Sequence, residues 1–220
     1  AHYSLAFLDK KSGKYYDNVF LKATEIKKNI YRFNLSDEYI YFLTHAAKHF
    51  KYGGFGVKSV ADNYCFLNAD IDFNYVEKEL DRLNLLKFYA AFKNVAENWF
   101  GKTPLSDDGA AFEEYIAVGA NYGTSKNYAA MNFTDDNSGK KYLLSKIFPS
   151  AKIMSQKYAV LEKAPALLPV FWVVRAVGFL FRKDKKTAVK GVVKTSGAVD
   201  EESVKTARDA KRAAGFDENE

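Results

Sequence analysis

Residues 35–54, LSDEYIYFLTHAAKHFKYGG, decide the fold class of this chain. Apolar side chains recur in them at steps of three and four residues, as on the buried face of a helix: Ile40, Leu43, Ala47 and Phe50. Ser36 is a good N-cap, and the acids after it suit the positive end of the helix dipole. Gly53 and Gly54 can end the helix. The stretch therefore predicts an amphipathic helix that begins near Ser36 and stops before Gly53.

Similar periodicity extends over most of the chain. Helices are expected at 15–28, 57–67, 86–100, 106–118, 137–147 and 165–181, and a further one after Ser150. Another should begin at a cap, Asp72 or Asn74, and run through Leu83. The segment 57–67 could also be a strand. A strand is expected at 2–8, a turn at 9–14 and irregular structure at 119–131. We therefore predict a mainly α protein, a multi-helix domain with one or two N-terminal strands.

Composition supports a folded chain with a basic surface. Of the 220 residues, 48% are hydrophobic and 16% aromatic, which is enough for a core and excludes global disorder. The net charge of +6 fits either a solvated surface or affinity for phosphate, nucleotide or an anionic surface. No run of five basic residues occurs, and no specific nucleic-acid partner is expected. Cys65 is the single cysteine, which excludes an intrachain disulfide, and its apolar neighbours predict a buried thiol.

The apolar segment 166–181 raises the question of a membrane. It has 16 residues with Arg175 near its middle, whereas a spanning helix needs roughly 20. Packing against the core is the first interpretation. Peripheral membrane contact through 166–186 is the second, because basic residues follow at once and favour anionic lipid. No secretory signal opens the chain, so a cytoplasmic location is expected.

Two segments near residue 50 could carry chemistry. His45 and His49 stand four apart and share a helix face, yet no Glu follows His45 and no Cys cluster completes a zinc site. A metal would need Asp62 or another acid. The glycine-rich segment 53–59 misses the P-loop and dinucleotide patterns. It is interpreted as a turn, although the amides that open the 57–67 helix could hold an anion beside Lys58.

The pair Asp70 and Asp72 is the third candidate. Two acids spaced by one residue point the same way on a strand, which is how a two-metal nucleotidyl site holds Mg²⁺. The residues before them read as a helix, however, and no Gly-Ser pair stands shortly before them. Asp72 is therefore interpreted as a helix cap, and we assign no catalytic or metal-binding residue.

Several segments together resemble the uncharacterised nucleotidyltransferase family. The principal block has His45, Lys48, His49 and Phe50, then Gly54, Gly56, Val57 and Lys58, then Asp62 and Tyr64 to Leu67. Further similar segments are Gly119 to Thr124, Lys141 to Leu144, Ile147 to Ser150, and Leu167 to Pro169 with Trp172 and Arg175. The likeness covers roughly residues 1–182. The family often has Arg where this sequence has Lys58, which would replace a bidentate phosphate contact by a point charge.

The resemblance implies a two-part enzyme. A palm domain would carry a Gly-rich turn and paired carboxylates for Mg²⁺, and a helical part would close the cleft. Residues 1–10 would be the last strand of a palm that is otherwise missing, since the chain opens at Ala1 within an apparent strand. Residues 11–182 would form the helical domain. Residues 183–220, which have few aromatics, would be a charged mobile tail with a possible helix at 199–214.

The resemblance also suggests which residues face the cleft. His45, Lys48, His49 and Lys58 would meet phosphate or acceptor, and Asp62 would orient a partner side chain. The same residues could instead be a polar network that joins two helices. The resemblance implies transfer of a nucleoside monophosphate from an NTP to an unknown acceptor, with this chain inactive alone. The alternatives are a non-catalytic binding module, perhaps at a membrane surface, and a metal-dependent hydrolase built on His45, His49 and Asp62.

Overall fold

Helices dominate the part of the chain that the structure describes. The computed structural model describes residues 10–17, 21–118, 125–131, 148–155, 157–180 and 199–217. In these ranges the strands form one two-stranded antiparallel sheet, so the predicted mainly α class is confirmed. The chain divides into two compact units, residues 1–131 with 205–220, and residues 132–204. The strand expected at 2–8 and the helix expected at 137–147 lie outside the described residues.

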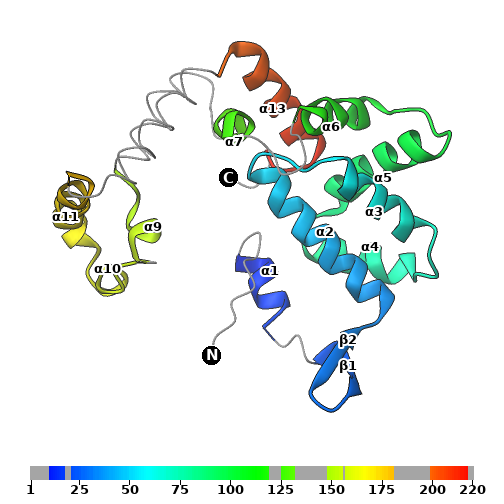
Figure 1. Ribbon diagram of the computed structural model, residues 1–220, viewed down its shortest axis with the longest axis horizontal. Helices are drawn as coiled ribbons and strands as arrows, with labels where there is room; N and C mark the ends of the chain where they lie inside the picture. Colours follow the sequence, from blue (N-terminus) through cyan, green and yellow to red (C-terminus); the bar gives the residue numbers. More distant parts are fainter. Residues whose placement is uncertain are drawn as a thin grey trace. The chain divides into compact units, whose positions relative to one another are not determined.

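The first unit contains most of the elements (Figure 1). They are α1 (Lys10–Tyr15), β1 (Ala23–Lys27), β2 (Ile30–Phe33), α2 (Leu35–Lys51), α3 (Val57–Leu67), α4 (Phe73–Arg82), α5 (Leu86–Phe100), α6 (Asp107–Ala117), α7 (Ser125–Met131) and α13 (Glu201–Ala213), which enters this unit at Lys205. Figure 1 shows α3 to α6 gathered along one side of α2 and α1 on the other. Helix α2 is thus the central element of this unit.

The ends of α2 follow local sequence signals, with one correction. Asn34 is the N-cap, because its side-chain oxygen accepts a 2.8 Å hydrogen bond from the backbone N–H of Asp37. The prediction that Ser36 caps the helix is wrong, since the Ser36 hydroxyl instead accepts a 3.1 Å bond from the N–H of Asp72. At the other end, Gly53 and Gly54 have φ angles of 120° and 98°. This left-handed backbone suits glycine, and the predicted stop is confirmed.

Three local predictions are wrong. The helix expected at 15–28 is replaced by α1, which ends at Tyr15, and by the hairpin of β1 and β2, so the turn expected at 9–14 is also replaced. Asn29 has φ 64° in the hairpin turn, a conformation that asparagine tolerates better than most residues. The irregular structure expected at 119–131 includes helix α7 from Ser125. The side chains of β1 and β2 are mostly exposed, so pairing between the two strands replaces the expected helix. In α7, by contrast, Ala129, Ala130 and Met131 are buried in the core.

The core of the first unit is aromatic. Phe50, near the end of α2, has no exposed surface and lies at its centre. Its ring centroid lies 4.5 to 6.4 Å from those of five other rings: Phe55, Phe88, Phe112, Tyr115 and Phe216. These rings come from α5, α6 and the segments that follow α2 and α13. One side chain therefore joins elements from both ends of the sequence.

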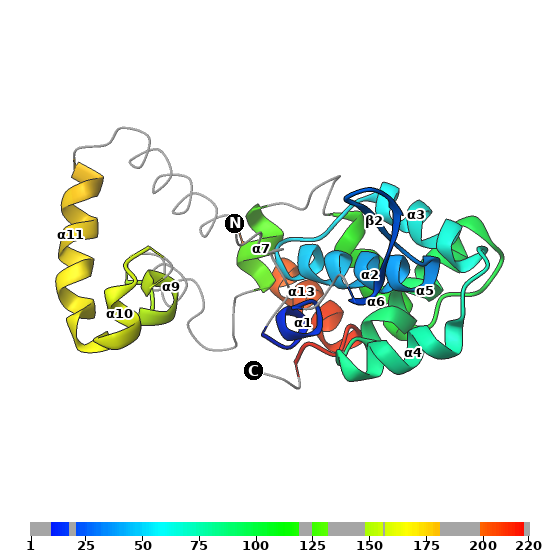
Figure 2. The ribbon, with the colours of Figure 1, turned by 90° about the horizontal axis from the view of Figure 1, so that it is seen from below.

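The C-terminal residues belong to this core. The helix expected at 199–214 is observed as α13, and Figures 1 and 2 show it at the end of the unit where α6 lies; the Thr206 hydroxyl donates a 2.8 Å hydrogen bond to Glu114 of α6. Its face of small residues, Ala207, Ala210 and Ala213, is buried, as is Phe216 beyond it. The stretch from Lys205 to Phe216 therefore packs on the helical domain, in contrast to the mobile tail expected at 183–220. The Phe216 side chain supplies apolar area that the sequence pattern alone did not indicate.

The second unit is smaller and is built around one apolar helix. Its described elements are α9 (Ala151–Ser155), α10 (Val160–Lys163), the 3₁₀ turn η2 (Pro165–Leu167) and α11 (Leu168–Leu180). The indole N–H of Trp172 on α11 donates a 2.9 Å hydrogen bond to the carbonyl of Pro149, and the Phe171 ring packs 4.6 Å from that of Tyr158. Among the described residues, no helix has both the length and the apolar character needed to cross a bilayer.

Candidate functional site

An open groove of about 520 Å³ lies between α2 and α3. It is lined by Leu35, Glu38, Tyr41, Phe42, His45, Asp62, Cys65, Phe66 and Ala69. Its walls are mainly apolar and aromatic, and the Phe42 and Phe66 rings lie 5.2 Å apart. The carboxylates of Glu38 and Asp62 and the imidazole of His45 supply the polar edge. An aromatic wall with a few polar groups is the usual lining of a small-molecule site.

Cys65 requires a correction at this groove. The apolar sequence around it predicted a buried thiol, but the structure places Cys65 on the exposed side of α3, in the groove lining. The apolar neighbours Tyr64, Phe66 and Leu67 are only half-buried, and Phe66 lines the same groove. Because Cys65 is the single cysteine of the chain, its thiol is a specific chemical reporter for this groove.

His45 and His49 form a pair at the end of α2. Their Nε2 atoms lie 2.9 Å apart, so one ring donates a hydrogen bond to the other. Burial and the positive charge of Lys48 lower the pKa of both rings below 6.5, and His49 lowers the pKa of His45 further. Both imidazoles are therefore mainly neutral at pH 7. The pair therefore offers a neutral donor and acceptor, not two positive charges, and of the two rings His45 lines the groove.

Lys58 and Asp62 form the second pair, on the facing helix α3. The Lys58 ammonium donates to the Asp62 carboxylate over 2.7 Å at the i and i+4 positions. The predicted role of Asp62, to orient a partner side chain, fits this contact. Since Asp62 lines the groove, the pair brings the exposed Lys58 charge to the groove rim. Gly56, the N-cap of α3, supplies no side-chain bond to the amides of the first turn.

The structure thus brings the five predicted residues to the end of α2 and the first half of α3. His45 contacts His49, Lys58 contacts Asp62, and His45 and Asp62 line one groove. Lys48 acts on this arrangement through its charge. Their role in binding a substrate stays a prediction.

Removing the Lys48 charge should raise the pKa of both histidines. In Lys48→Met the pKa of His45 and of His49 is expected to move up toward 6.5, because the repulsion that disfavours the imidazolium is lost. NMR titration of the ring protons measures both values. Lys102→Met, at an exposed lysine beyond α5, is the control and should leave them unchanged. Equal titration curves for Lys48→Met and the wild type would show that the Lys48 charge does not lower the pKa of the two histidines.

Asp70 and Asp72 do not form a metal site in this structure. Both precede α4 outside any strand, and the Asp72 carboxylate caps that helix by accepting a 3.0 Å bond from the N–H of Tyr75. The predicted cap at Asp72 is confirmed. Within the described ranges, no three His, Cys, Asp or Glu side chains are placed to hold a metal ion. The hydrolase hypothesis on His45, His49 and Asp62 therefore gains no support from these residues.

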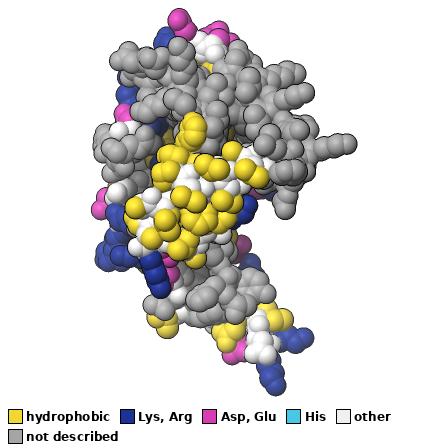
Figure 3. Space-filling view, turned by 90° about the vertical axis from the view of Figure 1, so that its left-hand side faces the viewer, with side chains coloured by type: hydrophobic (Ala, Val, Ile, Leu, Met, Phe, Trp, Pro, Cys, Tyr) yellow, Lys and Arg dark blue, Asp and Glu magenta, His cyan; other side chains and the backbone are white. Residues whose placement is uncertain are grey.

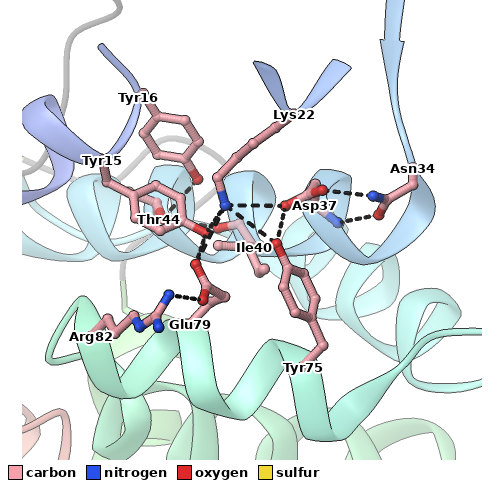
Figure 4. Close-up of polar contacts among 10 residues, drawn as sticks. All are labelled: Tyr15, Tyr16, Lys22, Asn34, Asp37, Ile40, Thr44, Tyr75, Glu79 and Arg82. Carbon is pink, nitrogen blue, oxygen red and sulfur yellow. Dashed lines mark hydrogen bonds and ion pairs between the residues drawn. The ribbon is translucent and has the colours of Figure 1, made fainter. Parts of the chain in front are cut away.

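A second polar cluster, which sequence reasoning missed, lies on the other side of α2 (Figure 4). The ammonium of Lys22 is at its centre and donates to the hydroxyls of Tyr15 over 2.7 Å and Tyr75 over 3.3 Å. It also lies 3.6 Å from the carboxylate of Asp37 and 3.4 Å from that of Glu79. Both carboxylates are buried, and Lys22 keeps only 26% of its side chain exposed. We call Lys22, Tyr15, Tyr75, Asp37 and Glu79 the Lys22 cluster.

The remaining contacts of the Lys22 cluster satisfy its two acids. The Tyr15 hydroxyl donates to Glu79 over 2.7 Å, and the Tyr75 hydroxyl donates to Asp37 over 2.9 Å. Arg82 forms a further ion pair with Glu79. Burial alone would raise the pKa of Glu79, but the Tyr15 bond and the charges of Lys22 and Arg82 outweigh it and lower that pKa below 4.5. The cluster joins α1, Lys22, α2 and α4, and with Arg82 included its two cations balance its two acids.

Comparison with known proteins supports the family resemblance. Residues 2–101 match the model of a family described as uncharacterised nucleotidyltransferase, which confirms the resemblance over these residues. The matched region contains the α2–α3 groove, the His45–His49 and Lys58–Asp62 pairs, and the Lys22 cluster. No curated protein matches the chain. No solved structure matches it.

Proposed function

We propose that this chain takes part in the transfer of a nucleoside monophosphate from an NTP to an acceptor. The proposal starts from the match of residues 2–101 to a nucleotidyltransferase family. The observation that carries the proposal is the α2–α3 groove, since it lies inside the matched region and is lined by the predicted residues His45 and Asp62. The groove would receive the nucleotide. It contributes binding and orientation, which are large terms in phosphoryl transfer.

The lining indicates how the nucleotide would lie. Tyr41, Phe42 and Phe66 give aromatic faces on which a base can stack. The neutral His45 and the Asp62 carboxylate can exchange hydrogen bonds with base or ribose. A phosphate inside the groove would be repelled by Glu38, so the phosphates would extend past the rim toward Lys58. Lys58 would then leave Asp62 or share its ammonium between carboxylate and phosphate.

The acids described here do not fit the Mg²⁺ that the family implies. The carboxylate of Asp72 caps α4, and those of Asp37 and Glu79 are held by Lys22 and Arg82. We therefore assign no step through a metal to these residues. In the proposed enzyme, a palm domain supplies the metal-binding carboxylates, and the 220-residue chain alone binds the nucleotide without turnover. Release of labelled pyrophosphate from an NTP by the purified chain would contradict this part.

Nucleotide binding can be tested through Cys65. ATP is expected to protect this thiol from alkylation by iodoacetamide, because a base stacked in the groove would cover it. In Lys58→Met, the ATP concentration that gives half protection should rise about fivefold, since an exposed charge contributes about 1 kcal/mol to binding. Mass spectrometry of the alkylated protein gives the fraction protected at each ATP concentration.

Lys93→Met is the matched control for Lys58→Met. Lys93 also faces an acid four residues away, Glu97, on helix α5 outside the groove lining. The Lys93→Met variant should bind ATP as the wild type does. Alkylation of Cys65 at the same rate with and without ATP would refute the groove as the nucleotide site. That result would favour the second candidate function, a non-catalytic interaction module, in which the His45–His49 and Lys58–Asp62 pairs only stabilise α2 and α3.

A further inference from the structure

Helix α11 has two apolar faces, and one of them is exposed. Phe171 and Trp172 pack against the rest of the second unit, with Leu168 and Arg175 on the same side of the helix. The opposite stripe, at positions i, i+3, i+4 and i+7, consists of Val170, Val173, Val174 and Val177, whose exposed fractions are 57%, 63%, 48% and 46%. Figure 3 shows this stripe as a continuous apolar area. We call it the valine face.

A surface helix of a soluble domain normally turns polar residues toward water. The valine face has none, and Leu167, 42% exposed, extends it at the start of the helix. Removing valine and leucine side chains from water is favourable, so the hydrophobic effect would favour the binding of a partner that covers the face. An exposed apolar area of this kind marks an interaction site.

Charge identifies the partner. Residues 163–194 contain eight Lys and Arg and one Asp, a net charge of +7, whereas the whole chain carries +6. The remaining residues therefore sum to −1, and the entire positive excess lies in the part of the sequence just before, on and directly after α11. Basic residues beside an apolar helix face favour a membrane surface that contains anionic lipid. A second copy of the chain would bring a second charge of +7 to the same place and is disfavoured.

We propose that the valine face docks on the surface of an anionic membrane. The valine side chains enter the boundary between headgroups and acyl chains, and the net positive charge of residues 163–194 is attracted by the anionic lipid. The helix lies in the plane of the interface, because the apolar segment 166–181 has 16 residues with Arg175 near its middle, fewer than the roughly 20 that a span requires. This docking is independent of the α2–α3 groove and of the proposed nucleotide site.

The experiment is co-sedimentation of the 220-residue chain with vesicles. The wild type should bind vesicles of phosphatidylcholine with phosphatidylglycerol at least tenfold better than vesicles of phosphatidylcholine alone, and added salt should weaken this binding. Val173→Asp with Val177→Asp should reduce binding at least tenfold. Both positions are exposed, so the fold should be retained, which circular dichroism verifies. Val118→Asp, at a valine 59% exposed beyond α6, is the control and should bind as the wild type.

Two results would overturn the proposal. One is equal sedimentation of the double variant and the wild type, or no sedimentation of either. The other is an oligomer of the wild type, measured by light scattering, together with a monomeric double variant and no binding of the wild type to vesicles. That result would assign the valine face to contact with a second copy of the chain. Protection of Cys65 by ATP is measured in the same variants. It should be unchanged in them, so failure of the membrane proposal is distinguishable from failure of the proposed function.

Discussion

Phe50→Ala is expected to lower the free energy of unfolding by about 4 kcal/mol, the largest effect of any single substitution considered. The Phe50 ring is fully buried, and the rings around it belong to α5, α6 and the segments after α2 and α13. Truncation removes the transfer free energy of the ring and leaves a cavity that these helices cannot all close. Since the free energy of unfolding of a domain is only about 5–15 kcal/mol, the Phe50→Ala variant should be only marginally stable.

Urea denaturation followed by circular dichroism measures this change. Phe100→Ala is the control, because Phe100 at the end of α5 keeps 43% of its surface exposed and should lose about 1 kcal/mol or less. Phe50→Leu, which retains most of the volume, should lie between the two. If Phe50→Ala and Phe100→Ala had the same midpoint, the aromatic core described around Phe50 would be wrong.

Lys22→Met is expected to cost about 2 to 3 kcal/mol, the second largest effect. The methionine keeps the apolar stem but removes the ammonium that faces the buried acids Asp37 and Glu79. Removing one partner of a buried ion pair costs about 3–5 kcal/mol because the other charge is left uncompensated. Lys22 is partly exposed and Arg82 remains beside Glu79, so the lower figure applies.

A double-mutant cycle separates charge from packing in the Lys22 cluster. Asp37→Asn in the Lys22→Met background should cost less than Asp37→Asn in the wild type, since the acid no longer has its cation. Lys93→Met, which breaks an exposed pair with Glu97, serves as the control and should lose less than about 1 kcal/mol. Additive effects of the two cluster substitutions would show that Lys22 and Asp37 act independently.

The pH dependence gives a further check on the same variant. The Lys22 cluster lowers the pKa of Glu79, so its contribution to stability is present above the unfolded pKa near 4.5 and is lost as pH falls through the folded value. The difference between wild type and Lys22→Met should therefore be complete at pH 7 and shrink below about pH 4.5. A difference that stayed constant into acid would indicate lost packing in place of lost charge.

The two proposals assign different tasks to the two units. The α2–α3 groove lies in the first unit and inside the region that matches the nucleotidyltransferase family, and it would hold the nucleotide. The valine face lies in the second unit and would hold the protein at an anionic membrane. Each task is tested by its own readout, alkylation of Cys65 or vesicle binding.

The sequence by itself determined the features that depend on neighbouring residues. Helical periodicity and the glycines after Tyr52 set the buried face and the end of α2. The spacing of His45 from His49, and of Lys58 from Asp62, is sufficient to put each pair on one helix face. These are local relations, since residues four apart on a helix are neighbours whatever packs around them.

Only the tertiary structure decided which distant residues meet. The partners in the Lys22 cluster are up to 64 residues apart, and nothing in the sequence around Asp37 or Glu79 marked these acids as buried. The exposure of Cys65 at the groove and the burial of Phe216 depend in the same way on which helices pack together. A side chain gains or loses its partners through contacts between whole elements, and local patterns of a single sequence do not encode that choice.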